Sequence, residues 1–539
     1  MTYARCLAAL GLVAAGCSAP APPLPSQVPP RVAAATAIGR VDAEAPIDFV
    51  LALQLRDPDG LAALLRDQAT PGSGRYRQFL TPAAFADAFA PTSADYARVV
   101  TALRARGLQV SESPSRTSVS VHGRAAEVEK AVGITLDRWI DQVGAFYAPS
   151  TEPRYPAEIQ AFTAGAAGLD DAGGWWSHRM PIPAGASGSY EPADLIKQYD
   201  SNGAGVGLGD GETVAILGSG FPPTVADVDG YVQKFALPVN RAAQYSQVFV
   251  GGPNRDPNGL AQNEYTENLL DVDMVLALAP HANVVHVFTA TNGPGLFSDG
   301  IVYIVNHVAQ AHQVSVSFGT CERGAAGEVL VMNQLFAQAK AEGQQWFFAS
   351  GDSGTDGCRD GRGNKVLSIG WPASSPYVLS VGGTEIVATS EEAWFGGGGG
   401  QSEIIDKPAF QKPQPGDTRA RTPGDGVRDQ PDIAALAGSP GVAIYGQGQL
   451  IPGVQGTSAA TPMWAAVWAL LDEAKGSHLG FSDGAERLYR VGASAGSGLR
   501  DITVGNNGNG STPGYNATVG YDLATGWGVP DVAKLVTQW

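Results

Sequence analysis

The stretch "TVAILGSG", from Thr213 to Gly220, decides the fold class. Four consecutive apolar residues stand between a threonine and a glycine-rich turn, which is typical of a strand buried on both faces of a sheet. The segment "TVADVDGYVQKFAL" at 224–237 then has the apolar spacing of a helix, and "YSQVFV" at 245–250 is a second strand. A strand, a helix and a strand in this order predict a parallel sheet.

The same alternation continues toward the C-terminus. Further strands are predicted at 283–290, 313–319, 344–351 and 376–383, and further helices at 266–279, 300–312 and 327–343. We therefore predict an α/β domain with a parallel sheet covered by helices on both faces. Active sites of such sheets gather at the carboxyl ends of the strands.

A different unit precedes this domain. Between residues 41 and 172 a helix leads into a strand at 95–110, and a strand leads into a helix at 118–133, which indicates an α+β unit. The following segment, 173–189, is rich in Gly, Pro and Ser and predicts an exposed junction of the kind that proteases cut. The α/β domain is then predicted to cover 190–539.

The N-terminus, "MTYARCLAALGLVAAGCSAP", is typical of an export signal over 1–17. One arginine precedes an apolar run that is too short to span a bilayer, and small residues follow it. Cys17 ends an "AAGC" segment that resembles a bacterial lipoprotein processing site, so lipidation of Cys17 and plain signal cleavage both stay open. A Pro/Ala-rich spacer is predicted at 18–40.

Composition excludes some classes of partner. The chain of 539 residues is 44% hydrophobic and 16% charged, with a net charge of −17. This charge argues against nucleic acid or an anionic membrane surface as the main partner. We expect a monomer that contacts a membrane only through a possible N-terminal lipid.

Two cysteines remain beyond the signal. Cys321 and Cys358 form an even pair in a chain predicted to be exported, which favours a disulfide bond. Two buried thiols are the alternative.

A candidate nucleophile lies in "GVQGTSAATPMWAA", at 453–466, where Ser458 stands between small residues just before an apolar helix. A serine nucleophile needs a base, commonly a histidine in an H-G-T context at a helix start. None of the seven histidines has this context, and a Ser-His-Asp triad is unsupported; they are His122, His178, His281, His286, His307, His312 and His478.

Carboxyl groups offer another base. Glu267 and Asp271 are four residues apart, so both project from one face of the predicted helix and influence each other's ionisation. Glu264 is an alternative member one turn earlier, whereas Asp273 points roughly the other way. Asp352, in "FFASGDSGTDG", directly follows a buried strand at the predicted active-site edge, although an aspartate that merely forms a turn has the same pattern.

These motifs together resemble the sedolisin family of serine-carboxyl peptidases. The resemblance rests on E-x-x-x-D, S-G-D-x-G and G-T-S-A-[AS]-x-P in this order, with supporting segments "SVSFGTCE", "WPASSPYVLSVGGTE", "PDIAAL" and "GYDLATGWG". It implies a subtilisin-like fold for the α/β domain. The N-terminal unit resembles the pro-kumamolisin activation domain, which implies a ferredoxin-like prodomain that inhibits the enzyme and is then removed.

The resemblance also assigns roles. Ser458 is implied as the nucleophile that forms an acyl-enzyme, Glu267 as its general base, Asp271 as the residue that orients Glu267, and Asp352 as the oxyanion-hole acid. A histidine with an ordinary pKa of about 6.5 is protonated in acid, whereas a glutamate can still accept a proton there. The implied function is an exported, acid-active endopeptidase for proteins and peptides, processed near the Arg179–Gly188 junction.

A calcium ion is implied as cofactor by "LRDITVGNNGNGSTPGYNATVGYDLATG". Asp501 and Asp522 would supply carboxylates, and Ile502, Thr518 and Gly520 main-chain carbonyls, which are hard oxygen ligands that suit Ca²⁺. Thr518 stands where the family usually has Gly. The alternative is a glycine-rich loop with two solvated aspartates.

Two rival functions remain at the level of sequence. One is a subtilisin-like protease with an unrecognised histidine base, and the other is an inactive, lipid-anchored surface protein that serves binding. Substitution of each histidine tests the first, and acid proteolysis assays on Glu267→Gln and Ser458→Ala proteins test the second.

Overall fold

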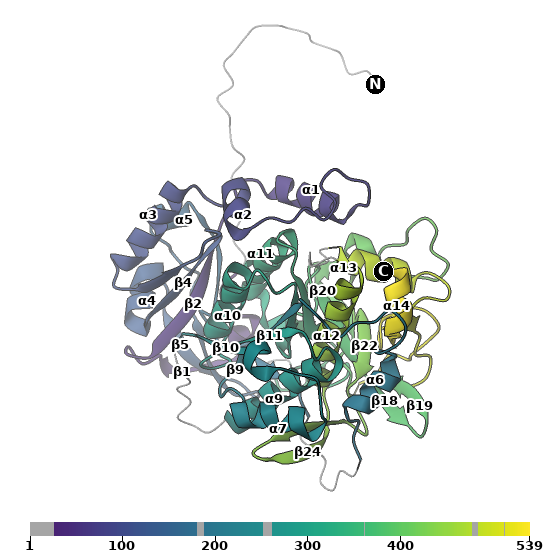
Figure 1. Cartoon of the computed structure of the whole chain (residues 1–539). Helices are drawn as coiled ribbons and strands as arrows, with labels where there is room; N and C mark the ends of the chain where they lie inside the picture. The colour runs from purple at the N-terminus through teal and green to yellow at the C-terminus, as the bar shows by residue number, and fades with distance from the viewer. Residues whose placement is uncertain (1–25, 181–187, 252–260, 360–361, 477–482, 511) are drawn as a thin grey trace, which may run out of the picture.

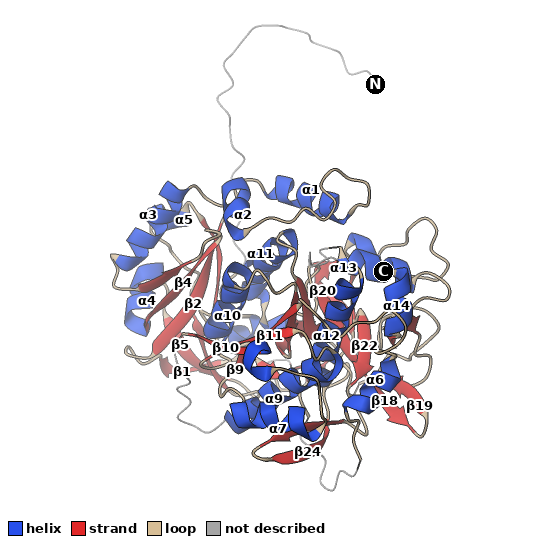
Figure 2. Ribbon diagram, in the orientation of Figure 1, coloured by secondary structure: helices blue, strands red, loops and turns tan. Residues whose placement is uncertain are grey.

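The computed structural model describes residues 26–180, 188–251, 261–359, 362–476, 483–510 and 512–539. The predicted signal with Cys17, and residues 181–187 of the predicted junction, lie outside the described residues. Figure 1 shows an N-terminal unit beside a larger domain, and Figure 2 shows the helices and strands of both.

The larger domain is built on one long sheet. Its strands run in the order β10-β11-β9-β12-β14-β18-β19, and β22 also pairs with β18. All pairs are parallel except β18 with β19. The strands are β9 Thr213–Ser219, β10 Tyr245–Val250, β11 Asn283–Thr289, β12 Gln313–Val316, β14 Gln345–Ala349, β18 Leu379–Val387, β19 Ser390–Ala393 and β22 Ile433–Leu436.

Helices cover both faces of this sheet, as predicted. Along β9, Val214 and Ile216 belong to one buried cluster, and Ala215 and Leu217 to another, because successive side chains point to opposite faces. Helices α9 and α12 fill the first cluster, and α10 and α11 the second. The helices are α6 Pro192–Tyr199, α7 Val225–Lys234, α8 Arg241–Gln244, α9 Ala261–Leu278, α10 Pro294–His307, α11 Ala326–Ala341, α12 Thr457–Ala474, α13 Gly484–Gly492 and α14 Val532–Gln538.

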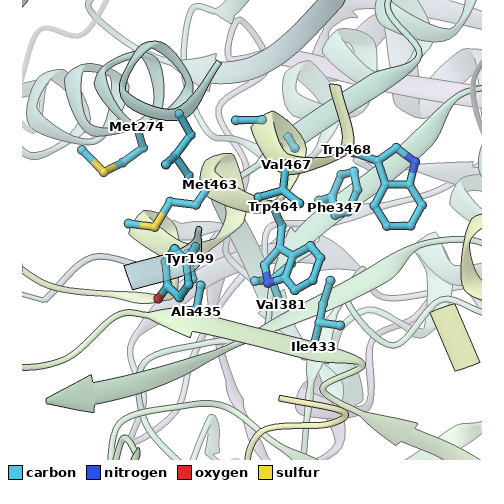
Figure 3. Close-up of a cluster of buried hydrophobic side chains, with 14 of the residues drawn as sticks. Tyr199, Met274, Phe347, Val381, Ile433, Ala435, Met463, Trp464, Val467 and Trp468 are labelled. Atoms are coloured by element: carbon cyan, nitrogen blue, oxygen red, sulfur yellow. The ribbon is translucent and has the colours of Figure 1, made fainter. Parts of the chain in front are cut away.

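Helix α12 is the centre of the first cluster. Figure 3 shows Trp464, Val467 and Trp468 of this helix packed over Phe347 of β14 and its neighbours. The rings of Phe347 and Trp468 meet edge to face at 5.3 Å, and the Trp464 indole N–H donates to the carbonyl of Ala434 at 2.7 Å. This packing holds the first turn of α12 in a fixed place above the carboxyl ends of the strands.

Two helices begin earlier than predicted. Helix α9 begins at Ala261 and not at residue 266, and α10 spans Pro294–His307 where the sequence predicted a helix at 300–312. Proline is tolerated in the first turn of a helix because the missing N–H has no partner there. Residues 294–299 therefore form the first turns of α10.

The N-terminal unit has the ferredoxin-like arrangement that was predicted. Its four-stranded antiparallel sheet has the order β3-β4-β2-β7, and β1, β5 and β6 form a small second sheet. The elements are η1 Pro30–Ala34, β1 Thr36–Arg40, β2 Pro46–Leu53, α1 Pro58–Ala69, α2 Pro82–Phe89, α3 Ser93–Arg104, β3 Gln109–Glu112, β4 Ser118–Arg124, α4 Ala125–Val132, β5 Leu136–Ile140, β6 Ala145–Pro149, α5 Ala157–Gln160 and β7 Thr163–Ala167.

This unit packs directly on the larger domain. Helices α10 and α11 lie between the two sheets, with β2 and β7 against them, and α1 packs along α11. Polar contacts fix the register: the Gln334 side chain donates to the carbonyls of Leu53 and Thr117, and Thr117 donates to Gln338 at 2.8 Å. Apolar burial with satisfied polar groups makes this a close, specific interface.

Short strands form small sheets outside the main sheet. They are β8 Trp176–Ser177, β13 Phe318–Cys321, β15 Cys358–Arg359, β16 Lys365–Val366, β17 Gly370–Trp371, β20 Gly400–Asp406, β21 Val427–Gln430, β23 Val442–Gly446, β24 Gln449–Val454, β25 Leu499–Arg500 and β26 Val529–Pro530. Cys321 of β13 and Cys358 of β15 form a disulfide bond with their Cα atoms 5.2 Å apart, so the disulfide prediction is confirmed. It ties the segment that follows β12 to the segment that follows β14.

Within the residues that the structure describes, no helix is both long and apolar enough to cross a membrane.

The buried carboxyl groups predict a fold that is most stable in acid. Burial raises the pKa of Asp299 to about 7, and those of Glu328 and Glu342 to about 8. The folded chain therefore keeps protons that the unfolded chain loses above about pH 4, so stability falls as the pH rises from there to about 8. We expect the Tm of the Ser458→Ala chain to be lower at about pH 8 than at about pH 4.5.

Glu342→Gln is the matched variant. The amide can still accept the hydrogen bond that Gln338 donates to Glu342 at 2.9 Å, but it has no proton to lose. It should reduce the loss of stability between these pH values by on the order of 2 kcal/mol. A Tm that rises with pH over this interval contradicts the prediction.

Candidate active site

Ser458 lies in the first turn of α12 and is fully buried. Gly456 precedes the helix with φ of +137°, a conformation that L side chains rarely adopt. A Cβ added there would lie 2.3 Å from the carbonyl oxygen of His178 and 2.7 Å from Oδ2 of Asp352. The glycine of the G-T-S segment is therefore required by space and by backbone conformation, and it lets two oxygens approach the serine.

Glu267 and Asp271 lie on α9, which packs along α12, and both are fully buried. Burial raises the pKa of Glu267 to about 7 and that of Asp271 well above its usual value, to which the charge of Glu267 also contributes. The two carboxyl groups therefore titrate as a coupled pair whose protonated forms are favoured by burial. At Glu267 the Ser458 hydroxyl and the Arg179 guanidinium oppose this effect and lower its pKa.

Glu267 faces the serine. The hydroxyl groups of Ser458 and Ser317 are near enough to lower the pKa of Glu267 against the effect of burial, although neither carboxylate oxygen completes a hydrogen bond of ordinary geometry. The Ser458 hydroxyl instead donates to the Ser317 carbonyl oxygen, at 3.4 Å. A small movement of the hydroxyl toward Glu267 is therefore enough for proton transfer, and catalytic hydrogen bonds are often long before substrate is engaged.

Asp352 follows β14 and reaches the start of α12. Its Oδ1 accepts hydrogen bonds from the Thr457 amide at 2.7 Å and the Thr457 hydroxyl at 2.8 Å. Its Oδ2 is buried and has no hydrogen-bond partner. Burial raises the pKa of Asp352 well above its usual value. A protonated Oδ2 in this position is a hydrogen-bond donor beside the nucleophile.

The structure thus brings Ser458, Glu267, Asp271 and Asp352 together. The alternatives lie elsewhere: Asp273 accepts the Tyr445 amide at 3.0 Å on another side of α9, and Glu264 lies against Gly220.

The histidine rings have other surroundings. The His178 ring lies against Gly319 and Gly351, and burial lowers its pKa to about 4. No histidine ring among the described residues hydrogen-bonds Ser458. His122 contacts Asp48 and Asp299, His281 contacts Asp210, His286 contacts Tyr245, His307 stacks on Tyr303, and His478 lies outside the described residues.

Sequence reasoning missed two supporting residues. Ser317 follows β12 and donates to Oδ1 of Asp271 at 2.6 Å, and Thr457 both binds Asp352 and accepts the Gly351 amide at 3.2 Å. Strands β12 and β14 are paired in parallel, so Ser317 and Asp352 follow neighbouring strands at one edge. The rule that selected Asp352, a polar residue directly after a buried strand, also points to Ser317.

The predicted calcium ligands also converge. The loop that contains Thr518 and Gly520 is held by both carboxylates: Gly520 N–H donates to Asp501 and Thr518 N–H to Asp522, each at 2.8 Å. Burial raises the pKa of Asp522 to about 6 and also raises that of Asp501, so a cation there would relieve an electrostatic cost. The donor set of carboxylate and main-chain oxygens fits Ca²⁺, although Arg419 already pairs with Asp501.

A second acidic cluster was not predicted. Glu212, His312 and Asp472 place potential ligand atoms within 4.8 Å of one another. Glu212 and His312 directly precede β9 and β12, so this cluster lies at the amino ends of the strands, opposite the nucleophile.

Comparisons with known proteins agree with this architecture. Residues 33–172 match the family described as "Pro-kumamolisin, activation domain", and residues 248–521 match the "Subtilase family". The chain is 30% identical to sedolisin of Pseudomonas sp. (strain 101), over 90% of this chain and 86% of that protein, and 29% identical to kumamolisin of Bacillus sp. (strain MN-32), over 92% of each. A solved structure of Pseudomonas sedolisin, a serine-carboxyl proteinase complexed with pseudo-iodotyrostatin, aligns with a TM-score of 0.55 and 31% identity over 66% of this chain and 98% of that one.

The geometry of Gly456 predicts the effect of a single methyl group. Gly456→Ala should reduce hydrolysis of a protein substrate in acid by about 100-fold or more, because the Cβ displaces Asp352 or the backbone beside Ser458. Gly424→Ala is the control, since a Cβ there meets no atom within 4 Å. Near-normal activity of Gly456→Ala would show that the two oxygens do not converge there.

Proposed function

The chain belongs to the sedolisin family, and on that premise we propose that it is an exported zymogen of an acid-active serine-carboxyl endopeptidase. The observation that carries the proposal is the burial of Glu267 against Ser458, with no histidine ring hydrogen-bonded to Ser458 among the described residues. The chain is a serine-type peptidase by its family, and a carboxylate is the available base.

The proposed reaction uses the four residues in sequence. Ser458 Oγ attacks the substrate carbonyl carbon while Glu267 takes its proton, and Asp271 steadies Glu267. The negative oxygen that forms accepts hydrogen bonds from the Ser458 amide and from protonated Asp352. Glu267 then gives its proton to the leaving amine, and water releases the acyl group by the same steps.

Substitution of the base tests this assignment. Glu267→Gln and Ser458→Ala should each lower kcat/KM for a peptide substrate by at least about 1,000-fold in acid. Asp273→Asn is the matched control, because Asp273 is a buried carboxyl on the same helix that binds the Tyr445 amide instead. Retained activity in Glu267→Gln, with loss on substitution of a histidine, would favour the rival histidine base.

The proposed role of Asp352 predicts the pH dependence. A carboxylic acid donates a hydrogen bond only while protonated, so activity should fall as rising pH removes the Asp352 proton. Asn donates at every pH, so in Asp352→Asn this fall should weaken or move to higher pH, with a lower maximum rate. A wild-type optimum above about pH 7, or an unchanged profile in the variant, would contradict the role.

The N-terminal unit, predicted at 41–172 and extended in the structure by η1 and β1 at 30–40, is proposed to act as an intramolecular inhibitor. It is proposed to be joined through a cleavable junction at 173–189 to a peptidase domain at 190–539. Support comes from its close packing on α10 and α11 and from the activation-domain match. Cys17 is proposed either to leave with the signal or to carry a lipid that holds the precursor on a membrane. The proposed substrates are proteins and peptides, and the enzyme is proposed to act as a monomer.

Calcium is proposed at Asp501, Ile502, Thr518, Gly520 and Asp522. When bound, Ca²⁺ would neutralise the two carboxylates and join the segments at 501–502 and 518–522, which stabilises the fold and takes no part in the reaction.

Removal of the ion should therefore lower stability. We expect metal analysis to find about one calcium per chain, and chelation to lower the Tm by several degrees. Asp501→Asn keeps an acceptor for the Gly520 amide but loses the charge, so it should bind calcium weakly and respond little to chelator. Equal calcium content in both proteins would place the ion elsewhere, for example at Glu212, His312 and Asp472.

A further inference from the structure

An imidazole and two carboxyl groups meet at the end of the main sheet that is opposite the nucleophile. Glu212 directly precedes β9, His312 directly precedes β12, and Asp472 lies in the last turn of α12. Because β9 and β12 are neighbouring parallel strands, their amino ends place Glu212 and His312 side by side. One nitrogen or oxygen atom of each of the three side chains lies within 4.8 Å of those of the other two.

The two carboxyl groups of this cluster are withdrawn from water. Glu212 is 1% exposed and Asp472 is 0% exposed. The Gln313 side-chain amide donates to Asp472 Oδ2 at 2.6 Å and to Glu212 Oε2 at 3.5 Å, so one amide lies against both carboxyl groups. Oδ1 of Asp472 has no hydrogen-bond partner in the part of the chain that the structure describes. A buried oxygen without a partner costs free energy, and a cation at this point would bind it.

The local charge also favours a cation. The carboxyl end of a helix carries a partial negative charge, and the last turn of α12 contains Asp472 but no basic residue. Arg77 and Arg487 supply positive charge nearby, but both pair with Asp483, at 3.5 Å each. The cluster therefore combines two buried carboxyl groups with the negative end of a helix.

The donor set identifies the kind of cation. An imidazole nitrogen is a good ligand for Zn²⁺, whereas Ca²⁺ prefers a shell of oxygen atoms. Zn²⁺ binds imidazole nitrogen and carboxylate oxygen at roughly 2.0–2.2 Å, so atoms within 4.8 Å of one another reach one ion after small side-chain rotations. His312 is partly exposed, which leaves the ion a path from solvent.

From this geometry we propose that Glu212, His312 and Asp472 bind one Zn²⁺ ion, with water completing its coordination. Asp472 lies near the end of α12 and Ser458 at its start, which places about 20 Å between them at the helical rise of about 1.5 Å per residue. The ion therefore takes no part in the proposed peptidase reaction. It joins the amino ends of β9 and β12 to the end of α12.

The test is Zn²⁺ binding by the full-length Ser458→Ala chain, which lacks the nucleophile. The chain is freed of metal with a chelator and returned to excess calcium at about pH 7, where an ordinary imidazole is mostly neutral. It is then titrated with Zn²⁺ in a calorimeter. We expect one Zn²⁺ per chain, and a higher Tm because the ion binds the folded chain. No binding, or no rise in Tm, overturns the proposal.

Two substitutions remove the ligands one at a time. Asp472→Asn keeps an acceptor for the Gln313 amide but loses the charge, and His312→Gln removes the imidazole at a partly exposed position. Each should weaken Zn²⁺ binding by at least about 100-fold. His281→Gln is the matched control, because the partly exposed His281 contacts Asp210 instead, and it should bind Zn²⁺ as the parent does. Unchanged affinity in both ligand variants, or loss in His281→Gln alone, would contradict the assignment.

Cobalt gives a readout that needs no substitution. Co²⁺ added in place of Zn²⁺ should show the strong visible absorption of an ion with few ligands, since a Zn²⁺ site of three side chains and water is close to tetrahedral. The weak spectrum of six-coordinate, hydrated Co²⁺ would overturn the proposal.

A last variant separates this site from the proposed calcium loop. Asp501→Asn removes a carboxylate from that loop and should leave Zn²⁺ binding unchanged. Loss of Zn²⁺ binding in Asp501→Asn would place the ion at the calcium loop and overturn the assignment to Glu212, His312 and Asp472. None of these measurements uses peptidase activity, so the proposed function and the metal site are tested separately.

Discussion

Everything at this site depends on carboxyl groups that are buried around one serine. Water is kept from Glu267, Asp271 and Oδ2 of Asp352, so burial raises the pKa of each group. In water these three groups would all carry charge near neutral pH, and none could donate a hydrogen bond. Burial favours the protonated form of each group, and at Glu267 the nearby Ser458 hydroxyl and Arg179 guanidinium act against it. The large apolar cores on both faces of the sheet make this burial possible.

The fold positions these groups by simple means. Neighbouring parallel strands end at one edge, which places Ser317 and Asp352 close together, while α9 and α12 pack side by side above that edge. The precursor uses the same edge for its own chain, because β8 occupies the place of an extended peptide. The segment that follows the N-terminal unit therefore lies along the edge that holds Ser458 and Asp352, where the Ser458 amide donates to the His178 carbonyl.

Much of this was accessible from sequence, because each successful prediction used local information. Uninterrupted apolar runs such as 213–220 identified buried strands, and the spacing of Glu267 and Asp271 placed both on one helical face. The family motifs selected Ser458 and Asp352. The start of α10 at Pro294 instead of residue 300 is a local error, because the first turns of a helix can hold a proline. Two other features depend on distances between remote segments: the disulfide could not be separated from two thiols, and nothing local places the His178 oxygen at the Ser458 amide.

Asp352 is proposed to be a neutral acid when the enzyme works. Infrared difference spectroscopy tests this protonation state most directly. The spectrum of the Ser458→Ala, Asp352→Asn chain is subtracted from that of the Ser458→Ala chain, both recorded at the acidic pH of maximal wild-type activity. If Asp352 is neutral, the difference spectrum contains the carbonyl stretch of a protonated carboxylic acid, and this band disappears as the pH is raised. A difference spectrum with only the bands of an ionised carboxylate at that acidic pH would contradict it.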